Sequence, residues 1–114
     1  MCAIIGFEKY SHSKEDFMRG FAATVSRGPD MSRVIDTGNG YLGFHRLAIM
    51  GLDESGMQPF SLDGNYLVCN GEIYGFRKIK KELESEYTFK SESDCEILLP
   101  MYEKYGLSMF EKLD

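Results

Sequence analysis

The sequence predicts an α+β fold in which short strands and amphipathic helices contribute to one core. Two segments carry apolar residues at helical spacing behind a capping serine, and the other apolar runs are short and separated by turns that contain glycine. Because some of the strands are joined by hairpins, a layered mixed fold is favoured over a doubly wound parallel sheet. The 114 residues are enough for one domain and too few for two.

The first half of the chain is expected to contain one helix and three strands. The helix follows Ser13, which forms a capping-box pattern with Asp16, and it must end before Pro29. The pair Asn39-Gly40 between two apolar runs is a strong hairpin signal. The expected elements are a buried strand at 2–7, the helix at 13–26, and strands at 33–36 and 41–47.

The second half is expected to combine two short strands with two helices, after a turn at 63–65. The last helix is expected to begin at a capping box of Ser93 and Glu96, to kink at Pro100 and to stop at Gly106. The other elements are strands at 66–69 and 87–89 and an amphipathic helix at 76–83. The inward side chains of the last helix are Ile97, Leu98, Met101 and Tyr105.

Composition restricts the classes of function. A formal net charge of −5 argues against a nucleic-acid partner, and no apolar run approaches the ~20 residues of a membrane span. The N-terminus has no signal-peptide pattern, so a cytoplasmic chain is expected. Cys2, Cys69 and Cys95 are widely spaced, which favours reduced thiols over a disulfide framework or a zinc site. The one basic cluster is interpreted as a solvated helix face and consists of Arg77, Lys78, Lys80 and Lys81.

Cys2 directly follows the initiator methionine and is the first candidate for chemistry. Removal of Met1 would place a thiol and a free α-amino group on the same residue. A terminal amine titrates near ~8, below a lysine side chain, so it can act as a base near neutral pH. One residue would then supply both nucleophile and base, as in N-terminal threonine enzymes. The alternative is a small buried hydrophobic side chain, a common role of free cysteine.

Three residues are candidates for binding a substrate next to such a nucleophile. Asn70 and Gly71 follow a predicted strand and can direct a side-chain amide and a backbone N–H at one point. An acyl-transfer site needs such donors for its oxyanion, although Asn-Gly is also an ordinary hairpin turn. Arg46, at the end of a strand, is suited to hold a carboxylate through two parallel hydrogen bonds, or forms a surface salt bridge.

Glu72 and Asp94 are candidates for holding a cationic amine. Asp94 lies just inside the predicted capping box, where its alternative role is to stabilise the N-terminus of the helix. His45 is interpreted as a satisfied structural histidine, and His12 is given no role. Together the candidates suit a substrate that carries an α-carboxylate, an α-ammonium group and a side-chain amide.

The order and spacing of several motifs resemble the class II, or N-terminal nucleophile, glutamine amidotransferases. Among these, the asparagine synthetase-like members are the most similar, and the resemblance covers almost the whole chain. The motifs are Met1-Cys2 with Ile4 and Gly6, Arg27-Gly28-Pro29-Asp30, residues 42–49, Gln58-Pro59-Phe60, Asn70-Gly71-Glu72-Ile73-Tyr74 and residues 93–98.

The resemblance implies an N-terminal nucleophile hydrolase-like αββα sandwich that hydrolyses L-glutamine to glutamate and ammonia through a thioester on Cys2. It implies an oxyanion hole of Asn70 and Gly71, and binding of the substrate's α-amino group by Glu72 and Asp94. Arg46 would hold the α-carboxylate, and the backbone of Leu47, Ala48, Ile49 and Met50 would line the pocket. No metal or organic cofactor serves this half reaction in the family, whose ATP and Mg²⁺ belong to a synthetase domain that has no counterpart in these residues.

Departures from the family pattern bear on these expectations. Ala3 and Gly75 stand where the family usually has a glycine or serine and an asparagine, and residues 1–114 are shorter than a family domain. We therefore expect the N-terminal portion of a truncated amidotransferase domain, working with a synthetase domain or subunit in cis or in trans, or as a homo-oligomer. The alternatives are a glutamine-binding module without turnover and an inactive fragment that needs a partner chain.

Overall fold

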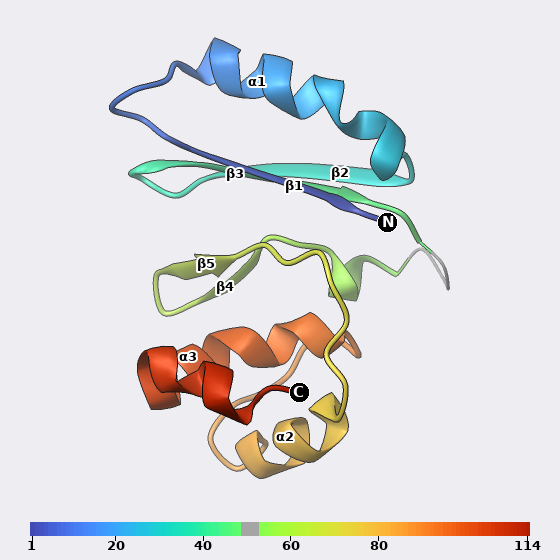
Figure 1. Ribbon diagram of the computed structural model, residues 1–114, viewed down its shortest axis with the longest axis vertical. Helices are drawn as coiled ribbons and strands as arrows, with labels where there is room; N and C mark the ends of the chain where they lie inside the picture. The colour runs from blue at the N-terminus through green and yellow to red at the C-terminus, as the bar shows by residue number, and fades with distance from the viewer. Residues whose placement is uncertain (49–52) are drawn as a thin grey trace.

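The computed structural model describes residues 1–48 and 53–114. Its helices and antiparallel strands confirm the predicted α+β class. The elements lie in layers along the long axis of the molecule, in the order of a helix, a three-stranded sheet, a hairpin and two further helices (Figure 1). Within the described ranges, no helix is both long enough and apolar enough to cross a membrane.

The three-stranded sheet is antiparallel, with β3 (Gly40–Arg46) in its centre. Strands β1 (Ala3–Glu8) and β2 (Met31–Asp36) each pair with β3 along one edge. Ala3 lies opposite His45 in the register, so the N-terminus of the chain and the end of β3 meet at one end of the sheet. This meeting point is where the candidate nucleophile lies.

The strand expected at 2–7 exists, but it is not buried as predicted. Alternate residues of β1 are covered and open, and Ile4 is 44% exposed. The reason is its position at an edge of the sheet, where one face packs on the neighbouring layer and the other remains accessible. The strands expected at 33–36 and 41–47 correspond to β2 and β3.

Helix α1 (Lys14–Ala23) covers the face of the sheet that points away from the hairpin (Figure 1). The predicted capping box is confirmed, because the Asp16 N–H donates to Ser13 Oγ at 3.1 Å and the Ser13 N–H donates to Asp16 Oδ2 at 3.3 Å. Phe17 and Phe21 are buried against the sheet. The helix ends earlier than expected, because a 3₁₀ turn, η1 (Val25–Arg27), follows it.

His45 links α1 to the sheet and is only 2% exposed. Its Nδ1 lies 2.6 Å from the Ser32 hydroxyl, and its Nε2 donates to the Phe21 carbonyl at 2.7 Å. The imidazole also stacks on the Phe21 ring, with 3.8 Å between the centroids. Both ring nitrogens therefore have partners, which confirms the structural role that the sequence indicated.

The loop that precedes β2 lies against the end of β3. A Cβ atom added at Gly28 would stand 2.3 Å from the His45 carbonyl oxygen, so only glycine fits there without a shift. The Asp30 N–H donates to the Arg46 carbonyl at 3.0 Å, and the Asp30 carboxylate accepts from the Ala48 N–H at 2.8 Å. These contacts hold the residues that follow β3 beside the N-terminus.

The second layer of strands is a hairpin of β4 (Phe60–Leu62) and β5 (Asn65–Leu67). The two loop residues, Asp63 and Gly64, have φ angles of +49° and +81°, as a type I′ turn requires. The turn expected at 63–65 is thus confirmed, whereas the following strand ends at Leu67 rather than at residue 69. A short 3₁₀ helix, η2 (Glu54–Gly56), precedes β4.

The helical layer is built from α2 (Phe76–Leu83), α3 (Leu98–Tyr105) and the 3₁₀ helices η3 (Asp94–Ile97) and η4 (Gly106–Lys112). Their common core contains the buried side chains Leu83, Ile97, Leu98, Met101 and Met109.

The strand predicted at 87–89 is absent. Tyr87 and Phe89 instead pack their rings against this core, so the alternating pattern reflects contact with helices rather than strand pairing.

The last helix begins differently from the prediction. Ser93 makes no side-chain cap, and Glu96 accepts instead from the N–H groups of Lys90 and Ser91 at 2.7 and 2.8 Å. Pro100 lies in the first turn of α3, where a missing N–H is tolerated. In place of the kink expected at Pro100, the helix is irregular where the 3₁₀ helix η3 changes to the α-helix α3. Gly106, at φ +59°, ends α3 as expected.

One member of the basic cluster on α2 is not solvated as predicted. Lys80 Nζ donates to the Ser91 carbonyl at 2.8 Å and lies 3.5 Å from Glu92 Oε2, with a side chain that is 13% exposed. Lys80 thereby ties α2 to the segment that leads into η3. The stem of this long side chain has become part of the packing, which helical spacing alone does not reveal.

Replacement of Gly28 by alanine tests the close approach at the end of β3. The new methyl group would overlap the backbone of β3, so we expect Gly28→Ala to lower the free energy of unfolding by about 1–3 kcal/mol. Gly71→Ala is the matched control, because nothing lies within 4 Å of the Cβ position at Gly71. Denaturant unfolding followed by circular dichroism measures both, and equal stabilities would contradict the packing described here.

Candidate active site

A cavity of about 480 Å³ lies where the sheet, the β5–α2 connection and η3 meet. Its size falls within the usual range of small-molecule sites. The cavity collects residues that are far apart in the sequence, from the N-terminus, the end of β3 and the segments around residues 70 and 94. Its lining includes Cys2, Phe44, Arg46, Leu47, Asp53, Ser55, Gln58, Cys69, Asn70, Gly71, Glu92, Ser93, Asp94 and Cys95.

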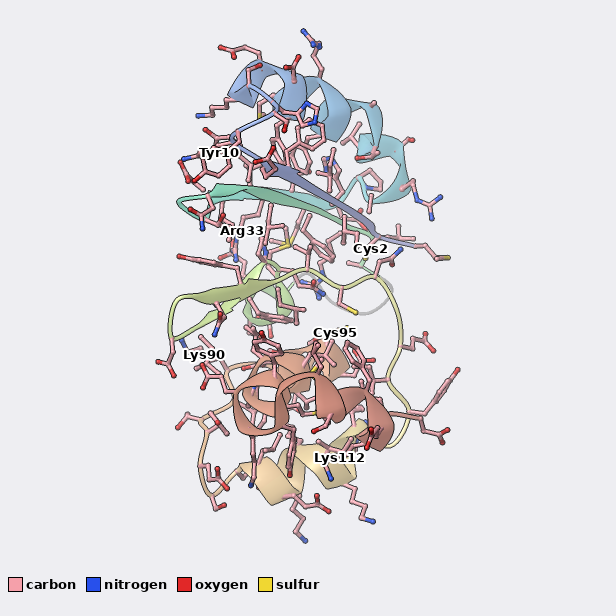
Figure 2. The ribbon with its side chains drawn as sticks, turned by 60° about the vertical axis from the view of Figure 1, so that its left-hand side comes forward. Cys2, Tyr10, Arg33, Lys90, Cys95 and Lys112 are labelled. Carbon is pink, nitrogen blue, oxygen red and sulfur yellow. The ribbon has the colours of Figure 1, made fainter. Side chains whose placement is uncertain are left out.

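Cys2 enters this cavity from the sheet side, immediately before β1 (Figure 2). The Leu47 N–H donates to Cys2 Sγ at 3.4 Å, and the Leu47 carbonyl lies 3.9 Å from the same sulfur. The thiol is half-buried. The pairing of β1 with β3 produces this contact, because it places the residue before Ala3 beside the residue after Arg46. Cys2 is therefore held in a defined direction and is still accessible from the cavity.

Arg46 is the last residue of β3 and supplies a guanidinium group to the cavity. Its Nη1 donates to the Asp53 carbonyl and lies 4.0 Å from Met31 Sδ. A guanidinium group has five N–H donors, so this contact does not exhaust its capacity to bind a carboxylate. The surface salt bridge that the sequence left as an alternative is not the role found, since the contact is to a backbone carbonyl.

The residues after Arg46 only partly line the cavity. Leu47 lines it and contacts Cys2, whereas Ala48 is not in the lining and has its N–H bound to Asp30. Ile49 and Met50, which were also predicted to line the pocket, lie outside the described residues.

Asn70 and Gly71 line the cavity from the connection between β5 and α2. They do not form a hairpin turn, because the next regular element after them is helix α2 rather than a strand. The ordinary-turn alternative is therefore wrong. The Gly71 carbonyl accepts from Cys95 Sγ at 3.8 Å, and the space around the Gly71 Cβ position is open.

The two predicted acidic residues have different positions. Asp94 lines the cavity, and its Oδ2 accepts from the Ile73 N–H at 2.6 Å while its Oδ1 accepts from the Cys95 N–H at 3.0 Å. Asp94 thus holds the 70–73 segment against η3. Glu72 is exposed, is not part of the lining and contacts the Tyr74 hydroxyl at 3.4 Å. The structure brings Asp94, but not Glu72, together with Cys2.

The cavity combines charges of both signs. Arg46 contributes the positive charge, and Asp53, Glu92 and Asp94 contribute carboxylates. Hydrogen bonds from Ser55 lower the pKa of the Asp53 carboxyl, with a smaller contribution from Arg46. This distribution is complementary to a ligand that carries both a carboxylate and an ammonium group.

Sequence reasoning missed several lining residues, among them Gln58, Cys69 and Cys95. Cys69 and Cys95 directly flank the predicted residues Asn70 and Asp94, which was the signal available in the sequence. A hydrogen bond from the Cys95 thiol to the ionised Cys69 sulfur, made in place of the one to the Gly71 carbonyl, lowers the pKa of Cys69 to about 7 and raises the pKa of Cys95 above its ordinary value.

Thiol alkylation should resolve this pair. Because the Cys95 thiol can donate a hydrogen bond to the Cys69 thiolate, we expect Cys69 to react with iodoacetamide with a midpoint near its pKa of about 7. Cys95→Ala should raise this midpoint toward the ordinary ~8.5, and Cys95→Ser, which keeps a donor, should raise it less. Peptide mass spectrometry after timed alkylation measures each midpoint. The same midpoint in the wild-type chain, Cys95→Ala and Cys95→Ser would contradict an effect of Cys95 on the pKa of Cys69.

The sequence of this chain is similar to proteins of known function. A family model described as a glutamine amidotransferase domain matches residues 1–114. A probable glutamine-hydrolysing asparagine synthetase of Acanthamoeba polyphaga mimivirus is 40% identical, covering 93% of this chain and 20% of the relative. Asparagine synthetase 1 of Bacillus subtilis is 34% identical and the amidase chry2 of Gibberella zeae is 35% identical, each covering 99% of this chain and 19% of the relative. The chain spans about a fifth of the length of these relatives, and by its family match it belongs to the glutamine amidotransferase domain family.

Proposed function

We propose that this chain carries the glutaminase half reaction of an asparagine synthetase-like amidotransferase. L-Glutamine and water become glutamate and ammonia through a thioester on Cys2. The observation that carries the proposal is a single cavity that contains Cys2, Arg46, Asn70 and Asp94. The relatives whose names specify glutamine hydrolysis support the choice of substrate.

The proposed chemistry starts with removal of Met1, which is 71% exposed. The new α-amino group of Cys2 takes the thiol proton, and the sulfur attacks the side-chain amide carbon of glutamine. The tetrahedral oxyanion accepts hydrogen bonds from the Asn70 side-chain amide and the Gly71 N–H. The carbon–nitrogen bond breaks, the ammonium group of Cys2 returns its proton to the leaving ammonia, and water then hydrolyses the thioester to glutamate.

The charged end of glutamine is proposed to bind between opposite charges. Arg46 takes the α-carboxylate and Asp94 takes the α-ammonium group, which agrees with the mixed charge of the lining. The family resemblance adds the backbone of 47–50 to the pocket and Glu72 to the ammonium site. The side chain of Glu72 lies outside the cavity lining.

We also propose that residues 1–114 are the N-terminal portion of an N-terminal nucleophile hydrolase domain with αββα layers. The order of helix, sheet, hairpin and helices supports this assignment (Figure 1), and so does the much greater length of the relatives. The proposed partner is a synthetase domain or subunit, with aspartate as the acceptor of ammonia and with ATP and Mg²⁺ bound there. That the glutaminase step takes no cofactor stays a prediction.

Replacement of the nucleophile is the direct test of this function. We expect mature wild-type chain to release glutamate from glutamine, and Cys2→Ala to reduce the release to background, because no thioester can form. The measurements are a coupled glutamate assay and intact mass, which reports loss of Met1. Cys2→Ala should still be thermally stabilised by glutamine, since the binding groups remain.

Two outcomes would separate the alternatives. Stabilisation by glutamine without glutamate release from the wild-type chain would indicate a binding module without turnover. No stabilisation and no release would reject a glutamine site in this chain.

Substitution of the guanidinium group tests the carboxylate site. Arg46→Lys keeps the charge but loses the paired hydrogen bonds, so we expect KM for glutamine to rise about tenfold while kcat changes little. Arg33→Lys is the matched control, because Arg33 lies on β2 outside this cavity and donates to the Met57 carbonyl at 3.4 Å. Steady-state kinetics of both variants test whether Arg46 binds the substrate carboxylate. An unchanged KM for glutamine in Arg46→Lys would contradict this role.

A further inference from the structure

Gln58 is a buried polar side chain whose two polar groups both form hydrogen bonds with one residue, Cys69. It is 4% exposed, although glutamine is usually found at the surface. Its Nε2 donates to the Cys69 carbonyl at 3.0 Å, and its Oε1 accepts from the Cys69 N–H at 2.6 Å. A single side chain therefore satisfies the whole backbone of the residue that precedes Asn70.

The register of the β4–β5 hairpin explains this pairing. Its antiparallel partners are Leu62 with Asn65 and Phe60 with Leu67, and two further residues along each strand bring Gln58 opposite Cys69. Hydrogen-bonded and non-hydrogen-bonded pairs alternate in such a ladder, so two hydrogen bonds are expected between the residues at the positions of Gln58 and Cys69. The β4 strand begins only at Phe60, and the side-chain amide of Gln58 supplies the donor and the acceptor that its backbone would have supplied.

The pairing of Gln58 with Cys69 affects the adjacent Asn70–Gly71 segment, which belongs to no helix or strand. On one side, Gln58 fixes the Cys69 peptide groups. On the other side, Asp94 fixes the Ile73 N–H at 2.6 Å. The two anchors together restrain the backbone of residues 70–71, which line the cavity.

We infer that Gln58 is a positioning residue for the oxyanion donors Asn70 and Gly71. It lies in the cavity lining, but its polar groups are bound to Cys69 and not directed at a ligand. Its contribution is expected mainly in the transition state, because the oxyanion exists only there, whereas Arg46 and Asp94 bind the charged end of the ground state. This inference rests on the proposed glutaminase function.

The test compares Gln58→Met, which is similar in size and makes neither hydrogen bond, with Gln58→Glu, whose carboxyl group, held protonated by burial, keeps an acceptor for the Cys69 N–H and a donor for the Cys69 carbonyl. We expect kcat for glutamate release to fall about 10–100-fold in Gln58→Met and less in Gln58→Glu, with KM for glutamine within about twofold of wild type. An aldehyde analogue of glutamine, which forms a tetrahedral adduct on Cys2, should lose affinity in the same order, while glutamate should not.

A double-mutant cycle separates positioning from general stability. If Gln58 acts through Asn70, then Gln58→Met should reduce kcat much less in an Asn70→Ala background than in the wild-type chain. Equal losses in both backgrounds, a rise in KM that matches the fall in kcat, or unfolding of both Gln58 variants would overturn the inference. Wild-type activity that depends on Cys2, together with unaffected Gln58 variants, would overturn the inference and leave the proposed function standing. An inactive wild-type chain would overturn both.

Discussion

The antiparallel pairing of β1 with β3 is the constraint on which the site depends. It places Ala3 opposite His45 and therefore sets Cys2 beside Leu47 and Arg46, so the thiol and the guanidinium group come from adjacent strands of one sheet. The loop before β2 reinforces this end of the sheet. Gly28 allows its backbone to touch β3, and Asp30 binds the residues on either side of Leu47.

The other half of the site is held by side chains rather than by a ladder. Cys69 is bound by Gln58 and Ile73 is bound by Asp94, so the irregular segment between them has an anchor at each end. Irregular backbone allows an amide side chain and a peptide N–H to converge on one point, which a regular strand does not, because its neighbours alternate in direction. The polar groups that hold this segment are therefore part of the architecture of the site.

Local signals predicted the elements well where short-range chemistry decides them. The Ser13 capping box, the Asp63-Gly64 turn and the end of α3 at Gly106 each depend on a few neighbouring residues. The predictions failed where distant packing decides: the strand expected at 87–89 packs on the helical core, and Glu96 binds the chain before η3 instead of capping with Ser93. For the candidate site, motif order predicted Cys2, Arg46, Asn70 and Asp94, which line one cavity. The Cys69–Cys95 contact and the pairing of Gln58 with Cys69 depend on which segments meet in space, so the motifs did not reveal them.

The layered arrangement divides the cavity between two structural units. The sheet side contributes Cys2 and Arg46, and the segments that follow the hairpin and lead into the last helix contribute Asn70, Gly71 and Asp94. Neither unit holds all of the proposed groups, so the proposed site exists only where the two units pack against each other.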